Sequence, residues 1–160
     1  NDTERILTVL DESLGILRLL IVIQFSLPGV PLIYYGDETG LKGGKDPDNR
    51  KSYPWGKEDV DLIDFYRKVI SIRKNENALK KGDLYILETD LEVLVFERNY
   101  ENEKVVVLVN PSKEIKLIKD INLNGVYINL FNSNEKYKFE GKDSIITIFP
   151  NNFKILKKIK

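Results

Sequence analysis

The spacing of apolar residues changes near Gly82, and this change constrains the fold more than any other feature of the sequence. Before Gly82, apolar residues recur at steps of three and four or form one continuous run, which is typical of alternating helix and strand. After it, they alternate with a period of two between turn residues, which is typical of antiparallel strands. The sequence therefore predicts an α/β piece over residues 1–82 and an all-β module over residues 83–160.

Helical periodicity dominates the first half. Apolar residues from Ile6 to Phe25 predict a short helix and a longer one, with a break near Gly15. The longer helix should be largely buried, because its middle is apolar on every face. A further helix with one apolar stripe is expected from near Asp59 to Lys74.

The continuous apolar run Val30–Tyr35 is typical of a central parallel strand that is covered on both faces. Parallel sheets need several strands, and residues 1–82 offer this one no partner. We therefore expect the segment to be the end of a longer α/β domain, which agrees with the absence of Met at position 1. The polar loop over residues 36–57 leaves the carboxyl end of this strand, where α/β folds build their sites.

Turn residues divide the second half into eight short strand candidates. Strands of this length and spacing, with no helical period between them, predict an antiparallel sandwich or barrel. The candidates are Leu84–Leu87, Val93–Arg98, Val105–Val109, Ile115–Ile118, Val126–Leu130, Lys136–Phe139, Ser144–Phe149 and Phe153–Leu156.

Composition narrows the chemistry. The 160 residues include no Cys, His or Met, and 25 basic side chains balance 25 acidic ones. Missing Cys and His exclude disulfides, thiolate or imidazole catalysis, and metal sites built from those residues. Zero net charge argues against a nucleic-acid partner. The most apolar stretch, Ile16–Phe25, is shorter than the roughly 20 residues of a membrane span, so no membrane partner is expected and the compartment stays open.

Acidic residues occur at the start of the chain and directly after the expected strand. At each place they could form part of a functional site or simply support the local fold. At the start of the chain, Asp2 or Thr3 suits a helix N-cap, which is the simpler interpretation from the residues alone. At the end of the expected strand, the adjacent Asp37 and Glu38 could bind a cation or sugar hydroxyls, or they simply begin a polar loop.

The segment Gly43–Arg50 matches neither the phosphate-binding loop nor the EF-hand spacing, so we expect no nucleotide cofactor and no metal ion there. It leaves Asp46 and Arg50 four residues apart, near Tyr53 and Trp55. This mixture suits a neutral polyhydroxyl ligand, because charged groups form bidentate hydrogen bonds and aromatic rings stack on apolar sugar faces. A surface loop held by a salt bridge is the alternative.

Taken together, these segments resemble the C-terminal third of an α-amylase-family glycoside hydrolase (glycoside hydrolase family 13), in particular its neopullulanase and cyclomaltodextrinase branch. The resemblance covers nearly all of residues 1–82, whereas the β half matches by position and pattern only. The most specific block is Leu27-Pro28-Gly29-Val30-Pro31-Leu32-Ile33-Tyr34-Tyr35-Gly36-Asp37-Glu38. The other matching pieces are Asp2-Thr3-Glu4-Arg5, Asp46-Pro47-Asp48-Asn49-Arg50, Tyr53-Pro54-Trp55, Phe65-Tyr66-Arg67, Ile72-Arg73 and Ala78-Leu79.

The resemblance implies an architecture. Residues 1–82 would be the last helix–strand–helix portion of a (β/α)8 barrel, with Val30–Tyr35 as its last strand. Residues 83–160 would form the family's C-terminal antiparallel β-sandwich. The other seven barrel strands would lie upstream, which accounts for the strand without a partner.

The resemblance also implies a chemistry, namely retaining hydrolysis or transfer at α-glucosidic bonds by a carboxylate nucleophile and a second carboxylate that serves as acid and base. Asp2 matches the family's third acid, which stabilises the transition state, whereas the nucleophile and the acid/base are not in this chain. Asp46 and Arg50 match the family's pair of residues that binds glucose units on the non-reducing side of the bond that is cleaved. One departure is Asn1, which stands where the family has His.

We therefore expect the isolated chain to be inactive. Its parent would cleave α-1,4 or α-1,6 links in maltooligosaccharides or other α-glucans and would need no cofactor. Two alternatives stay open, namely a non-catalytic carbohydrate-binding module derived from such an enzyme and a purely structural β-sandwich with a helical extension. A truncated barrel would also expose the edge of Val30–Tyr35, which predicts homodimers or swapped assemblies of the isolated chain.

Overall fold

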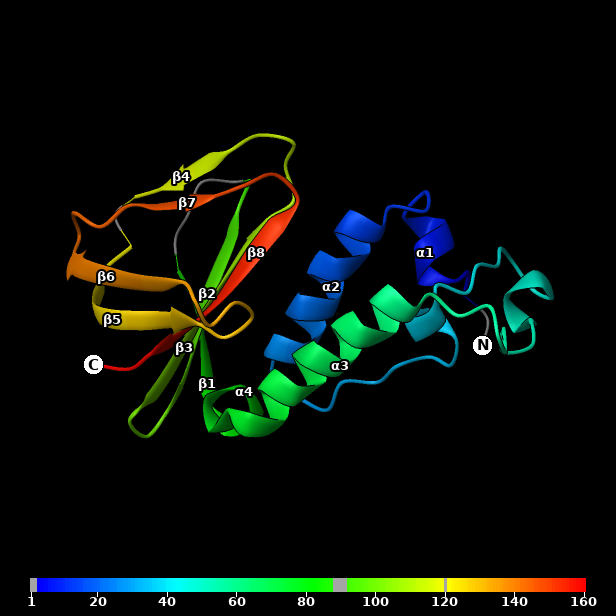
Figure 1. Cartoon of the computed structure of the whole chain (residues 1–160), viewed down its shortest axis with the longest axis horizontal. Helices are drawn as coiled ribbons and strands as arrows, with labels where there is room; N and C mark the ends of the chain where they lie inside the picture. Colours follow the sequence, from blue (N-terminus) through cyan, green and yellow to red (C-terminus); the bar gives the residue numbers. More distant parts are fainter. Residues whose placement is uncertain (1–2, 88–91, 120) are drawn as a thin grey trace.

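The computed structural model describes residues 3–87, 92–119 and 121–160, and these form a helical half and a β half (Figure 1). The helices are α1 (Ile6–Val9), α2 (Leu14–Ser26), α3 (Val60–Asn75) and α4 (Asn77–Lys81), with short 3-10 turns at Asp37–Thr39 and Asp48–Arg50. The strands are β1 (Asp83–Ile86), β2 (Leu94–Tyr100), β3 (Glu103–Asn110), β4 (Lys116–Ile118), β5 (Leu123–Asn129), β6 (Lys136–Gly141), β7 (Ile146–Ile148) and β8 (Asn152–Lys158).

The helix predicted from near Asp59 to Lys74 is confirmed as α3. Its first turn is capped by Asp59, whose Oδ1 accepts a hydrogen bond from the Leu62 amide at 2.9 Å. No helix among the described residues combines the length and the apolar character that a membrane span requires.

The predicted break between the first two helices is confirmed, although its position differs. It falls at Asp11 and Glu12, which adopt left-handed backbone conformations with φ of 49° and 63°. Gly15 lies inside α2 instead, because Ser13 starts that helix by accepting a hydrogen bond from the Ile16 amide.

The junction between the two halves is tighter than the sequence indicates. A short helix, α4, follows α3 where we expected only the end of the helical half. A Cβ atom at Gly82 would lie 2.5 Å from the carbonyl oxygen of Ala78 and 2.7 Å from that of Asn99. Glycine is therefore required where the chain passes from α4 into β1.

The strand predicted at Val30–Tyr35 is wrong for this chain: residues 3–82, all of which are described, contain no strand. A strand exists only when a neighbour completes its ladder of hydrogen bonds. Here side chains hold the segment instead, and Gln24 Nε2 donates to the Leu32 carbonyl oxygen at 2.9 Å. Val30 is 95% exposed and Leu32 is 73% exposed, so this apolar run lies on the surface.

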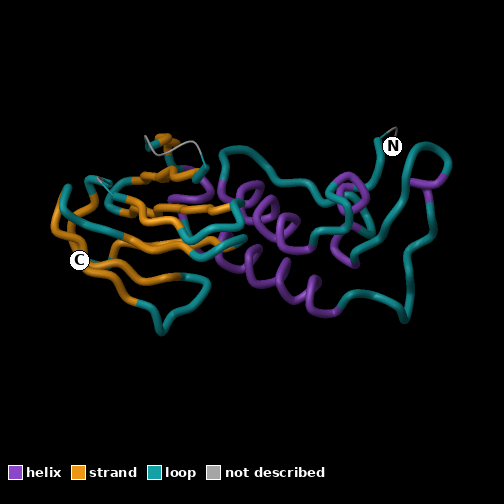
Figure 2. Tube along the Cα trace, turned by 90° about the horizontal axis from the view of Figure 1, so that it is seen from above, coloured by secondary structure: helices purple, strands orange, loops and turns teal. Residues whose placement is uncertain are grey.

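All eight predicted strands are present, with ends that differ from the predicted bounds. Six of them form one sheet in the order β1-β2-β3-β8-β5-β6, and β4 and β7 form a second, two-stranded sheet. Every pairing is antiparallel. Figure 2 shows the strands gathered at one end of the molecule and the helices at the other.

The centre of the six-stranded sheet is buried on both faces, whereas its edge strands β1 and β6 are largely exposed. Along β3, Val105, Val107 and Val109 belong to a core shared with the helices, whereas Val106 and Leu108 belong to a core shared with β4 and β7. Alternate residues of a strand point to opposite faces, so one strand serves two cores. The helical half and the β half are thus joined by a common apolar core.

The end of α2 is held by a buried arginine of α3. Arg73 donates to the carbonyl oxygens of Phe25 at 2.7 Å, Leu27 at 3.0 Å and Gly29 at 2.5 Å. The last carbonyl groups of a helix lack partners within the helix, and a cation is favoured beside them. Burial lowers the pKa of Arg73.

Candidate functional site

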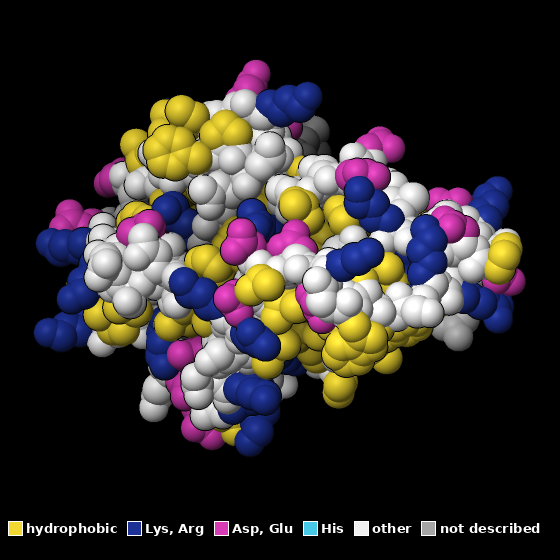
Figure 3. Space-filling view, turned by 45° about the vertical axis from the view of Figure 1, so that its right-hand side comes forward, with side chains coloured by type: hydrophobic (Ala, Val, Ile, Leu, Met, Phe, Trp, Pro, Cys, Tyr) yellow, Lys and Arg dark blue, Asp and Glu magenta, His cyan; other side chains and the backbone are white. Residues whose placement is uncertain are grey.

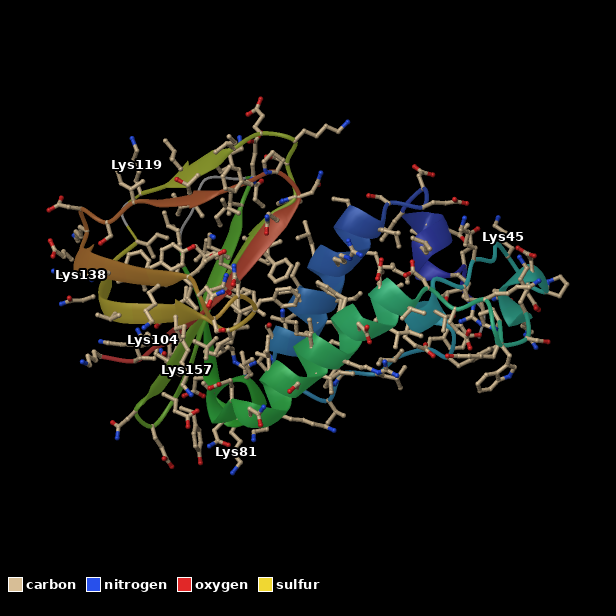
Figure 4. The ribbon with its side chains drawn as sticks, viewed as in Figure 1. Lys45, Lys81, Lys104, Lys119, Lys138 and Lys157 are labelled. Carbon is tan, nitrogen blue, oxygen red and sulfur yellow. The ribbon has the colours of Figure 1, made fainter. Side chains whose placement is uncertain are left out.

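The polar loop over residues 36–57 lies at the end of the molecule opposite the β-strands, where Lys45 marks it in Figure 4. The first described residues of the chain lie against it. The Arg5 amide donates to the Gly43 carbonyl oxygen at 2.9 Å, and Asn49 Nδ2 donates to the Thr3 carbonyl oxygen at 2.9 Å. The fold therefore brings the start of the chain and this distant loop together.

Asp46 and Arg50 contact each other on this loop. Arg50 Nε lies 2.7 Å from Asp46 Oδ1, Arg50 Nη2 lies 3.2 Å from Asp46 Oδ2, and both side chains are about half exposed. Hydrogen bonds from Lys51 and from the Gly44 amide hold the pKa of the neighbouring Asp48 below its usual value. An exposed ion pair contributes little to stability, and carboxylate and guanidinium groups are of the types that can hydrogen-bond hydroxyl groups.

Tyr53 and Trp55 form an aromatic pair on the same loop. Their ring centroids are 4.4 Å apart at an interplanar angle of 47°, and Trp55 is 81% exposed. Burial raises the pKa of the Tyr53 hydroxyl, and the nearby Glu38 carboxylate raises it further. An indole this exposed offers a flat apolar face to a ligand.

The start of the chain differs from the capping interpretation. Arg5, not Asp2 or Thr3, occupies the N-cap position of α1, and its side chain makes no capping hydrogen bond. Thr3 contributes its carbonyl oxygen to Asn49. Asp2, the predicted catalytic residue, lies outside the described residues.

The two adjacent acids that follow the 30–35 segment, Asp37 and Glu38, form contacts with other residues of the chain. Asp37 Oδ1 lies 3.3 Å from Nη1 of the buried Arg5, and Glu38 Oε2 accepts a hydrogen bond from the Gly36 amide at 2.9 Å. Burial raises the pKa of Asp37, while Arg5 opposes that rise. The part of the chain that the structure describes holds no group of three or more acidic side chains able to bind a metal ion.

Two cavities flank the 30–35 segment. One of about 490 Å³ lies beside α2, and one of about 480 Å³ lies beside α1 and the first described residues. Ile6, Leu32 and Asp37 line both, and most of the other residues that line the larger cavity are apolar. Neither cavity is lined by the four predicted sugar-binding residues. Hydrophobic side chains also gather in a patch on the helical half in the view of Figure 3.

A third cavity, of about 430 Å³, lies between α3 and the β half. A polar cluster around Glu135 borders it. Glu135 accepts hydrogen bonds from Tyr137 at 2.7 Å, Asn129 at 3.0 Å and Lys154 at 3.1 Å, which lower its pKa to about 2. The carboxylate is thus fully engaged in holding the turn between β5 and β6.

Two residues that connect this region were not singled out from the sequence. Arg5 and Asn49 are both fully buried. The local signal for Arg5 is its place directly before the first apolar residue of a helix, but polar residues usually start helices at the surface. Nothing local marks Asn49, because its burial depends on contact with Thr3, far away in the sequence.

Comparison with known proteins identifies relatives, although no family model matches the chain. Amylopullulanase of Thermoanaerobacter thermohydrosulfuricus is 44% identical over 119 residues, which is 65% of this chain and 8% of that protein. Cyclomaltodextrinase of Geobacillus thermopakistaniensis is 34% identical over 158 residues, which is 96% of this chain and 27% of that protein. The chain therefore spans only a small part of the length of its curated relatives.

Solved structures share the fold. An α-amylase from Anoxybacillus superposes with a TM-score of 0.89 at 27% identity, over 98% of this chain and 36% of that one. The maltogenic amylase from S. marinus superposes with a TM-score of 0.79 at 31% identity, over 98% of this chain and 21% of that one. The antiparallel β half matches the C-terminal β-sandwich of these enzymes.

Proposed function

Since the chain is homologous to the C-terminal part of α-amylase-family glycoside hydrolases, we propose that it is a segment of an α-glucan hydrolase and carries one side of its active site. Residues 1–82 complete the catalytic barrel, and residues 83–160 are the C-terminal β-sandwich domain. The exposure of the apolar 30–35 segment beside two cavities supports this, because barrel strands supplied from outside this sequence would cover it.

The observation that carries the proposal is the contact between the start of the chain and the loop of Asp46 and Arg50. This contact brings the residue after Asp2 to the base of that loop. In this proposal Asp2 stabilises the transition state by hydrogen bonds to sugar hydroxyls. Asp46 and Arg50 bind a glucose unit on the non-reducing side of the bond that is cleaved. Trp55 and Tyr53 add a stacking surface at the rim.

In this reaction a carboxylate nucleophile forms a covalent glycosyl-enzyme intermediate, and an acid/base carboxyl group first protonates the leaving oxygen and then activates water. Both groups come from residues outside this sequence. Hydrogen bonds to sugar hydroxyls that strengthen in the transition state contribute several kcal/mol to such reactions. This contribution is the one assigned to Asp2.

The function is tested with Asp2→Asn in the longer enzyme that carries this segment. We expect kcat on a chromogenic maltoside to fall about 10³-fold, because a loss of about 4 kcal/mol in the transition state corresponds to that factor. Asp64→Asn is the matched control, since Asp64 is an exposed residue of α3 paired with Arg67. Equal activity of the two variants would remove Asp2 from the mechanism.

The isolated 160-residue chain should not turn over the same maltoside. Turnover that disappears in Asp2→Ala would contradict this expectation, because a contaminating enzyme would be unaffected by the substitution. A carbohydrate-binding module is the second candidate, and the 81% exposure of Trp55 favours it. Calorimetric binding of maltotriose to the isolated chain, abolished by Trp55→Ala, would support the module in place of the hydrolase segment.

The open apolar surface should also make the isolated chain self-associate. Val30 and Leu32 are the most exposed apolar residues of the 30–35 segment, and such surfaces promote association. Light scattering should give a dimer or larger species, and Leu32→Lys should shift it toward the monomer. A monomer at high concentration in both proteins would contradict the prediction.

A further inference from the structure

Arg5 is a buried cation at the meeting point of three chain segments. Its side chain is fully buried, and Nε donates to the Asn49 carbonyl oxygen at 2.9 Å. Nη1 donates to the Tyr35 carbonyl oxygen at 2.5 Å and lies 3.3 Å from Asp37 Oδ1. The guanidinium carbon lies over the Tyr34 ring, 3.9 Å from the ring centroid.

These contacts hold the loop of Asp46 and Arg50 at its base. Asn49, whose carbonyl oxygen Arg5 binds, sits between those two residues in the 3-10 turn Asp48–Arg50. The Arg5 amide also donates to the carbonyl oxygen of Gly43, three residues before Asp46. Arg5 therefore connects the segment that follows Asp2 to the loop on both sides of Asp46.

We propose that Arg5 is the positioning residue of the active site, setting the position of the Asp46–Arg50 pair relative to the start of the described chain at Thr3. This inference rests on the proposed function. Arg5 does not touch substrate, because its side chain is covered on all sides. Its side chain acts through the carbonyl groups of Asn49 and Tyr35.

The contacts require a guanidinium group. Nε and Nη1 donate in fixed directions to two carbonyl oxygens while the guanidinium carbon lies over the rings of Tyr34 and Tyr35, a combination that an ammonium group cannot reproduce. Nη2 and the Tyr34 hydroxyl are also buried and have no hydrogen-bond partner among the described residues. Arg5→Lys therefore keeps the charge but loses the geometry.

Kinetics of the longer enzyme test the positioning role. We expect Arg5→Lys to lower kcat/KM for a maltoside about 100-fold, with a higher KM, because a displacement of about 1 Å in a site costs that much. Arg73→Lys is the matched control, since Arg73 is also buried and also donates to backbone carbonyl oxygens, but at the far end of α2. It should lower the melting temperature and leave KM unchanged.

A second measurement on the isolated chain separates this inference from the proposed function. Trypsin under native conditions should cut after Lys45 and Arg50 about 10-fold faster in Arg5→Lys than in Arg73→Lys, because only the first releases the loop. Equal cleavage of the two variants, or equal KM in the longer enzyme, would overturn the positioning role. An unaltered enzyme without activity on α-glucans would overturn the proposed function, while the trypsin result still decides the role of Arg5 in holding the loop.

Discussion

Phe96→Ala is expected to lower the free energy of unfolding by about 4 kcal/mol, the largest effect that we predict for a core substitution in this chain. Phe96 lies in β2, is fully buried, and belongs to the core shared by the helices and the six-stranded sheet. Its loss leaves a cavity where the two halves meet, so neither half can close the gap alone. Since domains of this size are stable by about 5–15 kcal/mol, the variant should be close to unfolding.

Urea unfolding followed by circular dichroism measures this effect. The matched control is Phe149→Ala, because Phe149 is 56% exposed and its removal should change the free energy by less than about 0.5 kcal/mol. A similar loss in both variants would show that the effect does not come from the shared core. Loss of the β signal alone would show that the two halves unfold independently.

Arg98→Met should lower the free energy of unfolding by about 3 kcal/mol. Arg98 is a buried residue of β2 whose Nη1 donates to the Ser26 carbonyl oxygen at the end of α2. Nη2 and Nε donate to the Gly82 carbonyl oxygen at 2.7 Å and 3.2 Å. Hydrogen bonds from a charged donor contribute about 1.5–3 kcal/mol each, and methionine fills much of the space without replacing them.

Arg98→Met also removes the free-energy cost of burying a charged guanidinium group, which limits the loss of stability. Burial lowers the pKa of Arg98, and the nearby positive charge of Arg73 lowers it further. Arg67→Met is the control in the same urea experiment, because Arg67 is 72% exposed and its ion pair with Asp64 lies on the surface. If Arg98→Met and Arg67→Met change stability equally, the buried arginine does not hold the two halves together.

The spacing of apolar and turn residues correctly predicted the helices and strands whose formation depends mainly on residues close in sequence. Helix α3 follows from its apolar stripe and its Asp59 cap, and the eight strands follow from alternation between turn residues. The pattern failed at Val30–Tyr35, where the residues suit a strand but residues 3–82 offer no partner strand. A strand is a property of two segments, so a single segment can only suggest it.

In the candidate site, too, the sequence predicts contacts between residues close in the chain but not contacts between distant ones. The residue types of Asp46, Arg50, Tyr53 and Trp55, with their spacing, were enough to predict a loop suited to a sugar, and contact between the members of each pair follows from their closeness in sequence. Arg5 could not be predicted as the residue that holds this loop. Its partners lie about 30 to 44 residues away, and only packing brings their carbonyl oxygens within reach.

Sequence alone thus decides where the period of apolar residues changes, and with it the order of a helical half and a β half around Gly82. Tertiary structure decides that the two halves share one core, because β3 alternates its valines between the helices and the second sheet. It also decides that a cation is buried beneath the polar loop. Both outcomes depend on contacts between segments far apart in the chain, whose free energy no local pattern records.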